Sequence, residues 1–148
     1  PEGVDVDGLS VTPLYTDRLA LIAREDLLPD GDGPLAWADA AQLPMCLLHE
    51  GMHGRDLVDA AARAHGVRLT PRLEADSVAT LLAMVGAGRC ASIVPRAWIA
   101  TYRAPSGTRT VELEGAGELA TSVALVRGAG DPESVLARAL AESAQRAD

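Results

Sequence analysis

The chain has 148 residues, of which 48% are hydrophobic, so it holds enough apolar material for one domain with a core. Its formal net charge is -8 at pH 7 and its arginines are scattered, which argues against nucleic-acid binding by this piece, because duplex binding relies on Lys and Arg to neutralise phosphates. No apolar run reaches the length of a membrane-spanning helix and no signal-peptide pattern opens the chain, so we expect neither.

The first third of the chain predicts two strands and one short helical turn. Residues 1–12 are acidic, contain glycine and show little periodicity, so we expect a loop there. Residues 19–23 form an apolar run of strand length. A helical turn is expected within 35–43, ended by Pro44, and the apolar run 45–48 predicts a second buried strand.

The middle of the chain favours two helices. Apolar residues at helical spacing predict a helix over 55–65, with Gly66 as its C-terminal cap. Alternating apolar residues predict an edge strand over 67–73. Asp76 and Ser77 are both suited to cap the start of the next helix, because each side chain can accept a hydrogen bond from a free backbone N–H.

The last third predicts strands over 90–94, 110–113 and 121–126, a short turn or helix over 98–102 and a final helix over 133–145. Pro132 stands at the start of that helix, as prolines often do. Its expected apolar stripe consists of Val135, Leu136, Ala139 and Leu140. Strands that alternate with helices of about ten residues indicate right-handed βαβ units, and therefore an α/β fold with a largely parallel sheet.

The two cysteines each lie in a strand-like apolar run, at Cys46 and Cys90. Cysteines in such runs behave as small buried hydrophobes, and free thiols persist in reducing compartments. The sequence therefore favours two buried free thiols over a disulfide, and a cytoplasmic location.

Four segments resemble the effector-binding domain of LysR-type transcriptional regulators. They are LYTDRLALIA at 14–23, WADAAQLP at 37–44, EADSVATLLAMVGAG at 74–88 and ASIVP at 91–95. The segments stand in the right order with the right gaps, and the resemblance covers roughly residues 12 to 146. It implies a periplasmic-binding-protein-like (type II) fold of two subdomains, here apparently lacking the first part of subdomain I.

The resemblance also implies a division of the chain. Residues 1–34 would hold the end of subdomain I and a hinge strand, 35–115 subdomain II, and 116–148 the returning hinge strand and the C-terminal helix of subdomain I. Family members form homodimers and tetramers, which we expect here too. They bind DNA through an N-terminal winged helix-turn-helix, which these residues do not include.

In the family the effector lies between the subdomains, and the resemblance places the contacts from subdomain II at 49–55 and 75–77. The predicted local structure supports the same two segments. Both follow predicted parallel strands, and a helix begins after each of them, where free N–H groups attract anions. Arg55 could bind a carboxylate bidentately and Ser77 could donate from its hydroxyl. We therefore expect a small anionic effector. The candidate residues are His49, Glu50, Gly51, Met52, Arg55, Ala75, Asp76 and Ser77.

Each of these residues also has a structural interpretation. Asp76 and Ser77 could serve only as a helix cap, and Arg55 could be a solvated helix residue. His49 and His53, with nearby acidic residues, make a weak metal pattern because they lack helical register and a third ligand. We expect neither a metal nor a cofactor.

The leading interpretation is thus the effector-sensing domain of a transcriptional regulator. A solute-binding protein of a transporter has the same two-lobed fold, and a signal peptide would favour it. A small enzyme on this fold is the third possibility, but the sequence offers no convincing constellation of acid, base and nucleophile.

Overall fold

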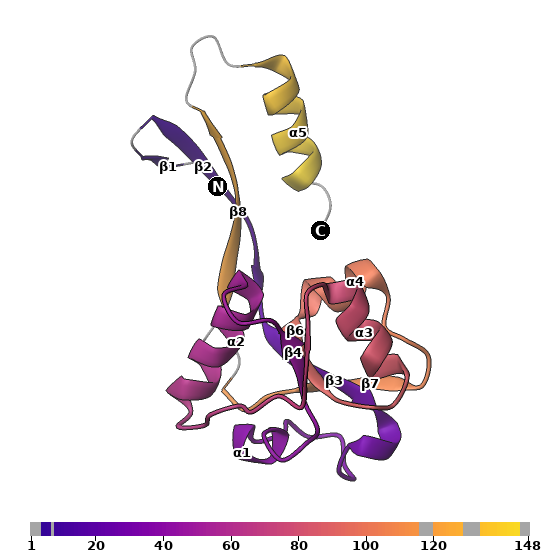
Figure 1. Cartoon of the computed structure of the whole chain (residues 1–148). Coiled ribbons are helices and arrows are strands. Elements are labelled where there is room, and N and C mark those ends of the chain that lie inside the picture. The colour runs from indigo at the N-terminus through magenta and orange to yellow at the C-terminus, as the bar shows by residue number, and fades with distance from the viewer. Residues whose placement is uncertain (1–3, 7, 116–119, 129–133, 146–148) are drawn as a thin grey trace. The chain divides into compact units, whose positions relative to one another are not determined.

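In a computed structural model of the chain, the described residues are 4–6, 8–115, 120–128 and 134–145. The chain divides into two compact units (Figure 1). The first unit is formed by residues 1–17 together with 121–148, and the second by residues 18–120. The assignment of these residues to subdomains I and II stays a prediction.

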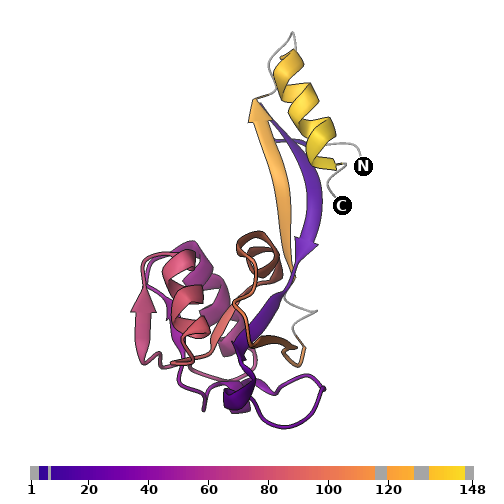
Figure 2. The ribbon, with the colours of Figure 1, turned by 90° about the vertical axis from the view of Figure 1, so that its right-hand side faces the viewer.

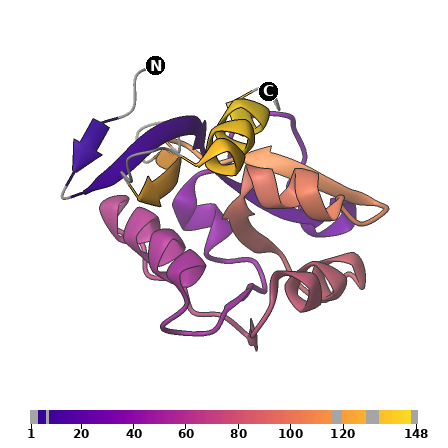
Figure 3. The same cartoon turned by 90° about the horizontal axis from the view of Figure 1, so that it is seen from above.

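The first unit contains a three-stranded antiparallel sheet in the order β1-β2-β8 (Figure 3). Its strands are β1 (Val4–Val6), β2 (Leu9–Asp17) and β8 (Thr121–Gly128). The prediction of a loop over residues 1–12 is therefore wrong for most of that segment. β2 pairs on one side with the neighbouring β1, as a hairpin, and on the other side with β8, more than a hundred residues away in sequence. Only the second of these pairings lies beyond the reach of a local sequence pattern.

The final predicted helix is present as α5 (Val135–Gln145), while Pro132 and Glu133 lie outside the described residues. Its predicted apolar stripe is exposed in this structure, with Leu136 at 82% and Leu140 at 60% of full exposure. Ala141 is the buried residue of this helix. The period of the stripe was correct for a helix, but nothing among the described residues covers it.

The described residues of the second unit form five strands. They are β3 (Leu19–Arg24), β4 (Cys46–Leu48), β5 (Leu73–Ala75), β6 (Ser92–Pro95) and β7 (Thr108–Glu112). Parallel pairing joins β4 to β5, and a parallel bridge between Met45 and Ala91 joins β4 to β6. β3 lies between β6 and β7 and is antiparallel to both.

Four of these five strands run in one direction, but strands pair in parallel only between β4 and β5 and at the bridge from β4 to β6. Pairing is antiparallel in β6-β3-β7 and in β1-β2-β8, so the prediction of a largely parallel sheet is confirmed only for the β4–β5 edge. The prediction is wrong for β3, which runs the opposite way. β3 follows β2 after a single residue, Arg18, with no crossover helix between the two strands, so it is not part of a βαβ unit with β2.

Helices cover both faces of these strands (Figure 1). They are α1 (Trp37–Ala40), α2 (His53–Ala64), α3 (Val78–Gly86) and α4 (Arg96–Tyr102), and a 3-10 turn spans Glu25–Leu27. Alternate residues of β3 point to opposite layers: Leu21 packs with residues of α1 and α2, and Ile22 packs with residues of α3 and α4. Burial on both faces explains why the predicted strands are continuous apolar runs.

The segment 67–73 is not the edge strand that its alternation predicted. The edge strand is β5, which begins only at Leu73 and lies at the outer edge of the sheet (Figure 2). Leu69 is buried against the layer of α1 and α2, which accounts for the alternation without strand pairing. Pro71 has no N–H to donate, and pairing to Met45 starts at the residue that follows it, Arg72.

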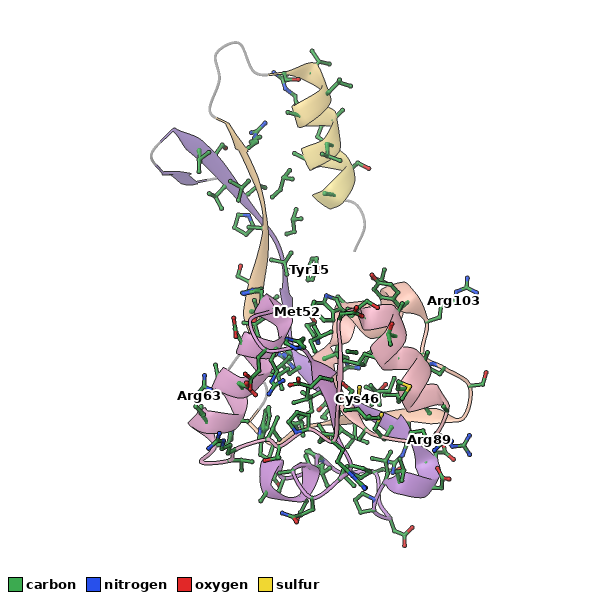
Figure 4. The ribbon with its side chains drawn as sticks, in the orientation of Figure 1. Tyr15, Cys46, Met52, Arg63, Arg89 and Arg103 are labelled. Atoms are coloured by element: carbon green, nitrogen blue, oxygen red, sulfur yellow. The ribbon has the colours of Figure 1, made fainter. Side chains whose placement is uncertain are left out.

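Both cysteines are free and buried, which confirms the prediction. Cys46 lies inside the second unit (Figure 4), in the layer covered by α3 and α4, together with Cys90. Burial, with a smaller contribution from the neighbouring Cys46, raises the pKa of Cys90 to about 12. Burial also raises the pKa of Cys46, against a smaller lowering by its hydrogen bond with Cys90. Both thiols therefore stay protonated near neutral pH.

Candidate functional site

The two predicted site segments meet at one edge of the sheet. β4 and β5 are parallel neighbours that end together, with Leu48 opposite Ala75. The N–H of His49 then donates to the carbonyl of Ala75 at 2.9 Å. A helix follows each strand, α2 from His53 and α3 from Val78. Residues 49–52 and 75–77 therefore share the carboxyl ends of the strands, where open α/β sheets bind their ligands.

Ser77 caps α3. Its Oγ accepts a hydrogen bond from the N–H of Thr80 at 3.2 Å and donates to Thr80 Oγ1 at 2.9 Å. Asp76, the other candidate cap, is exposed beside it. The N–H groups of Val78 and Ala79 have no acceptor within the helix, because the first turn of a helix lacks preceding carbonyls. The start of α3 thus offers two free donors next to a hydroxyl.

The loop before α2 turns at Gly51, whose φ of 86° lies in the left-handed region. Met52 is the N-terminal cap residue but supplies no side-chain hydrogen bond, and its side chain packs against the layer of α3 and α4 (Figure 4). His49 and Glu50 are exposed in this loop. The N-terminus of α2 therefore also presents uncapped N–H groups.

Close packing at the start of α2 leaves no room for a side chain at position 54. A Cβ on Gly54 would lie 2.6 Å from Cη2 of Trp98 and 2.9 Å from Cδ1 of Leu48. Overpacking of this kind typically costs about 1–3 kcal/mol. We therefore expect Gly54→Ala to lower the free energy of unfolding by about 2 kcal/mol in urea titrations.

Gly33 is the matched control, since its φ is not in the left-handed region and nothing lies within 4 Å of a Cβ there. Gly33→Ala is expected to leave the stability within about 0.5 kcal/mol or raise it slightly. Equal effects of the two substitutions would contradict the close packing of α2 against Trp98.

Arg55 is the most strongly connected of the predicted site residues. Its side chain is only 5% exposed. Nε donates to Asp59 Oδ2 at 3.0 Å, and Nη1 donates to Glu74 Oε1 at 2.7 Å and to the carbonyl of Leu48 at 2.9 Å. Nη2 lies 3.8 Å from Oε1 of Glu50, beyond hydrogen-bonding distance.

Burial lowers the pKa of Arg55, but the hydrogen bonds that it donates to Glu74 and Asp59, with the negative charges of these carboxylates, outweigh that effect and leave the pKa above its ordinary value. The guanidinium is thus a fixed cation that ties α2 to the ends of β4 and β5. Two carboxylates already neutralise it, so these contacts do not support a bidentate clamp on an outside anion.

One part of this network was visible in the sequence. Asp59 stands four residues after Arg55 in a helix, which is the spacing of an ion pair on one helix face. Glu74 is nineteen residues away, and only the parallel pairing of β4 with β5 brings it to Arg55.

A pocket of about 650 Å³ opens beside Arg55, between α2 and the segment 67–74. Of the predicted site residues, only Glu50 and Arg55 line it, and residues 75–77 do not. The predicted site is therefore split between the strand-end edge, which includes Ser77, and this separate pocket. The lining residues are Glu50, Arg55, Asp59, Arg63, Val67, Arg68, Leu69, Thr70, Pro71 and Glu74.

The weak histidine pattern does not assemble into a metal centre in the part of the chain that the structure describes. His49 lies 3.9 Å from Oε2 of Glu74, but no group of three or more His, Cys, Asp or Glu side chains suited to a metal ion occurs among the described residues. None of the described helices combines the length and the apolar character that crossing a membrane requires.

Comparison with known proteins supports the assignment of the fold. The structure is similar to that of a cysteine mutant of OxyR from Corynebacterium glutamicum, with a TM-score of 0.75 and 20% identity over 96% of this chain and 44% of that one. It is also similar to the regulatory domain of CcmR from Synechocystis PCC6803 in complex with 2-PG, with a TM-score of 0.77 and 17% identity over 97% of this chain and 69% of that one.

A third similar structure is full-length CbnR complexed with its target DNA, with a TM-score of 0.72 and 17% identity. This chain is covered to 98% in that comparison but spans only 50% of the CbnR chain. No match was found among curated protein sequences.

The family model described as the LysR substrate binding domain matches residues 1–148, the whole chain. The periplasmic-binding-protein-like fold that the sequence predicted is thereby confirmed, and the regulator is favoured over the solute-binding and enzyme alternatives. The chain belongs to the family of LysR substrate-binding domains, the effector-binding domains of LysR-type transcriptional regulators.

Proposed function

We propose that this domain senses a small anionic effector at the strand-end edge formed by residues 49–52 and 75–77. The observation that carries the proposal is the joint ending of β4 and β5, each followed by a helix with free N–H groups. Two helix N-termini at one edge attract negative charge, because their dipoles and unpaired donors point toward it. The binding of 2-PG by the similar domain of CcmR supports a small-molecule ligand.

The residues have different roles in this proposal. The backbone donors of Val78 and Ala79 would bind the anion, together with the Ser77 hydroxyl once it turns its proton away from Thr80 Oγ1, and His49 would stand at the opposite wall. The remaining candidates shape the edge: Glu50, Gly51 and Met52 form the loop, and Ala75 and Asp76 lead into α3. Arg55 would act as a positioning residue, since it holds the carbonyl of Leu48 directly before the loop.

Effector binding would change the relation of the two subdomains about the hinge strands, and through it the geometry of a homodimer or tetramer. DNA contact would come from a winged helix-turn-helix elsewhere in the protein, and the protein would act in the cytoplasm, where its DNA is. CbnR, a similar protein, has been seen complexed with its target DNA.

Thermal unfolding with a panel of small carboxylates and oxyanions tests the proposal. An effector at a hundred times its dissociation constant stabilises the folded state by about 2.7 kcal/mol. For a domain of this size we expect a rise in Tm of roughly 5–10 °C. A panel in which no anion raises the Tm would contradict an anionic effector at this edge.

Ser77 offers a matched pair of variants. Ser77→Asn and Ser77→Asp both keep a side-chain oxygen that caps α3, so both should fold like the parent chain. Ser77→Asp adds a negative charge beside the proposed anion and is expected to weaken binding at least tenfold, whereas Ser77→Asn should retain most of the affinity. Equal affinities of the two variants, measured by calorimetry with the stabilising anion, would remove Ser77 from the site.

A further inference from the structure

The pocket beside Arg55 is a separate feature from the strand-end edge, and it carries charges of both signs. Along α2, Arg55, Asp59 and Arg63 recur every four residues and therefore lie on one face of the helix. The opposite wall is the segment 67–74, which runs back from the end of α2 to β5. Three arginines and three carboxylates line the pocket, so its formal charge is balanced.

The negative and the positive side chains lie at different ends of the pocket. Glu50 and Glu74 lie near the start of α2, where they meet the guanidinium of Arg55. Arg63 lies on the last turn of α2 (Figure 4), and Arg68 follows shortly after the helix. Both of these arginines are exposed, and neither forms an ion pair with a described carboxylate. Eight residues of helix separate Arg55 from Arg63, which corresponds to about 12 Å along the axis.

The wall of the pocket also has free backbone groups. The N–H groups of Arg68, Leu69 and Thr70 make no hydrogen bond to described residues, although the flanking N–H groups of Val67 and Arg72 do. The segment from Arg68 to Thr70 is not part of the sheet, so strand pairing does not occupy its backbone groups. Extended backbone with unpaired groups is the usual partner of a peptide main chain.

A further donor belongs to a side chain that lines the same pocket, that of Arg55. Nη2 of Arg55 makes no hydrogen bond to the described residues, since its nearest carboxylate oxygen is 3.8 Å away. The side chain is otherwise buried and held rigidly by Asp59 and Glu74. A carbonyl oxygen of a ligand could therefore accept a hydrogen bond from a pre-positioned guanidinium.

We propose that this pocket is a second ligand site that binds a short peptide of two to three residues with free termini. The ammonium terminus would lie at Glu50 and Glu74, and the carboxylate terminus at Arg63 and Arg68. A tripeptide in extended form spans about 10 Å, which matches the separation of the two ends once side-chain reach is included. The cavity of about 650 Å³ is within the range of small-ligand sites.

The balanced charge of the pocket selects this class of ligand. A simple anion or cation would leave an excess of one sign in the pocket, whereas a peptide with both termini free adds no net charge. A free amino acid is also neutral overall, but its two charged groups are too close together to reach both ends.

Calorimetric titration of the chain with trialanine tests the proposal. Trialanine is expected to bind, and N-acetyl-trialanine, trialanine amide and free alanine are expected to bind at least tenfold more weakly. Failure of trialanine to bind, or equal binding of the capped forms, would overturn the proposal. Because Ser77 does not line this pocket, Ser77→Asp should leave trialanine binding unchanged, so the two sites can fail independently.

Arginine variants supply the second arm of the test. Arg68→Gln is expected to weaken trialanine binding at least tenfold, with no change in Tm, because Arg68 is exposed and forms no ion pair with the described residues. Arg72→Gln is the matched control, since Arg72 is an exposed arginine of the same segment that does not line the pocket. Equal losses of affinity in the two variants would show that only the general positive charge matters and would overturn the proposed site.

Discussion

Replacing Leu21 with alanine is expected to lower the free energy of unfolding by about 3 kcal/mol. Leu21 lies in the middle of β3, is fully buried, and pairs with Ile93 of β6 on one side and Val111 of β7 on the other. Its side chain packs in the layer that α1 and α2 cover. Alanine would leave a cavity surrounded by strands on both sides, where the backbone has little freedom to collapse into it.

Urea unfolding monitored by circular dichroism measures this loss as a lower midpoint with an unchanged slope. The matched control is Leu136→Ala in α5, where the leucine is 82% exposed, and there the change should stay within about 0.5 kcal/mol. A loss below about 1 kcal/mol for Leu21→Ala would contradict the central place of β3 in the core.

Arg55→Ala is expected to lower the free energy of unfolding by about 3 kcal/mol, close to the loss expected for Leu21→Ala. The substitution removes a guanidinium that is 5% exposed and leaves Asp59, Glu74 and the carbonyl of Leu48 without their donor. Truncating one partner of a buried charge network is costly because the opposite charges remain. The two carboxylates are partly exposed, so water can offset some of the loss.

Two variants make this prediction specific to the network. Arg55→Lys should recover less than half of the loss, because an ammonium group cannot reproduce the three divergent hydrogen bonds of the guanidinium. Arg63→Ala, on the same helix face but without an ion pair to the described residues, should change stability by less than about 0.5 kcal/mol. If Arg55→Ala lowers the free energy of unfolding no more than Arg63→Ala does, water solvates the carboxylates of Asp59 and Glu74 as well as Arg55 does. That result would contradict the prediction.

Local patterns predicted most of the elements of the second unit. Helical spacing placed α2 and α3 within about two residues of their observed ends, because one apolar stripe on each helix faces the buried sheet. Gly66 ends α2 with a φ of 71°, as expected of a C-terminal cap, and Ser77 caps α3. The order of strand and helix also indicated that segments 49–52 and 75–77 would lie at one edge of the sheet, where they now meet.

The candidate site was harder to predict than the fold, because its chemistry depends on pairs of residues that are distant in sequence. Arg55 looked like a free cation at a helix start, and no local pattern indicated that Glu74 would pair with it. The pocket on that side depends on the path of residues 67–72, whose alternation resembled a strand although the backbone does not pair.

The sequence by itself determined the α/β class, most of the helices, the two buried thiols and the segments that link β4 to α2 and β5 to α3, because each of these depends on neighbours within about one turn or one strand. The tertiary structure alone decided the pairing of β2 with β8, the reversed direction of β3, the partners of Arg55 and the exposure of the α5 stripe. Each of these is a contact between residues separated by tens of positions, or the lack of one. Such contacts depend on the tertiary arrangement of the whole chain. Local helix and strand propensities carry no information about which distant residue will be the partner.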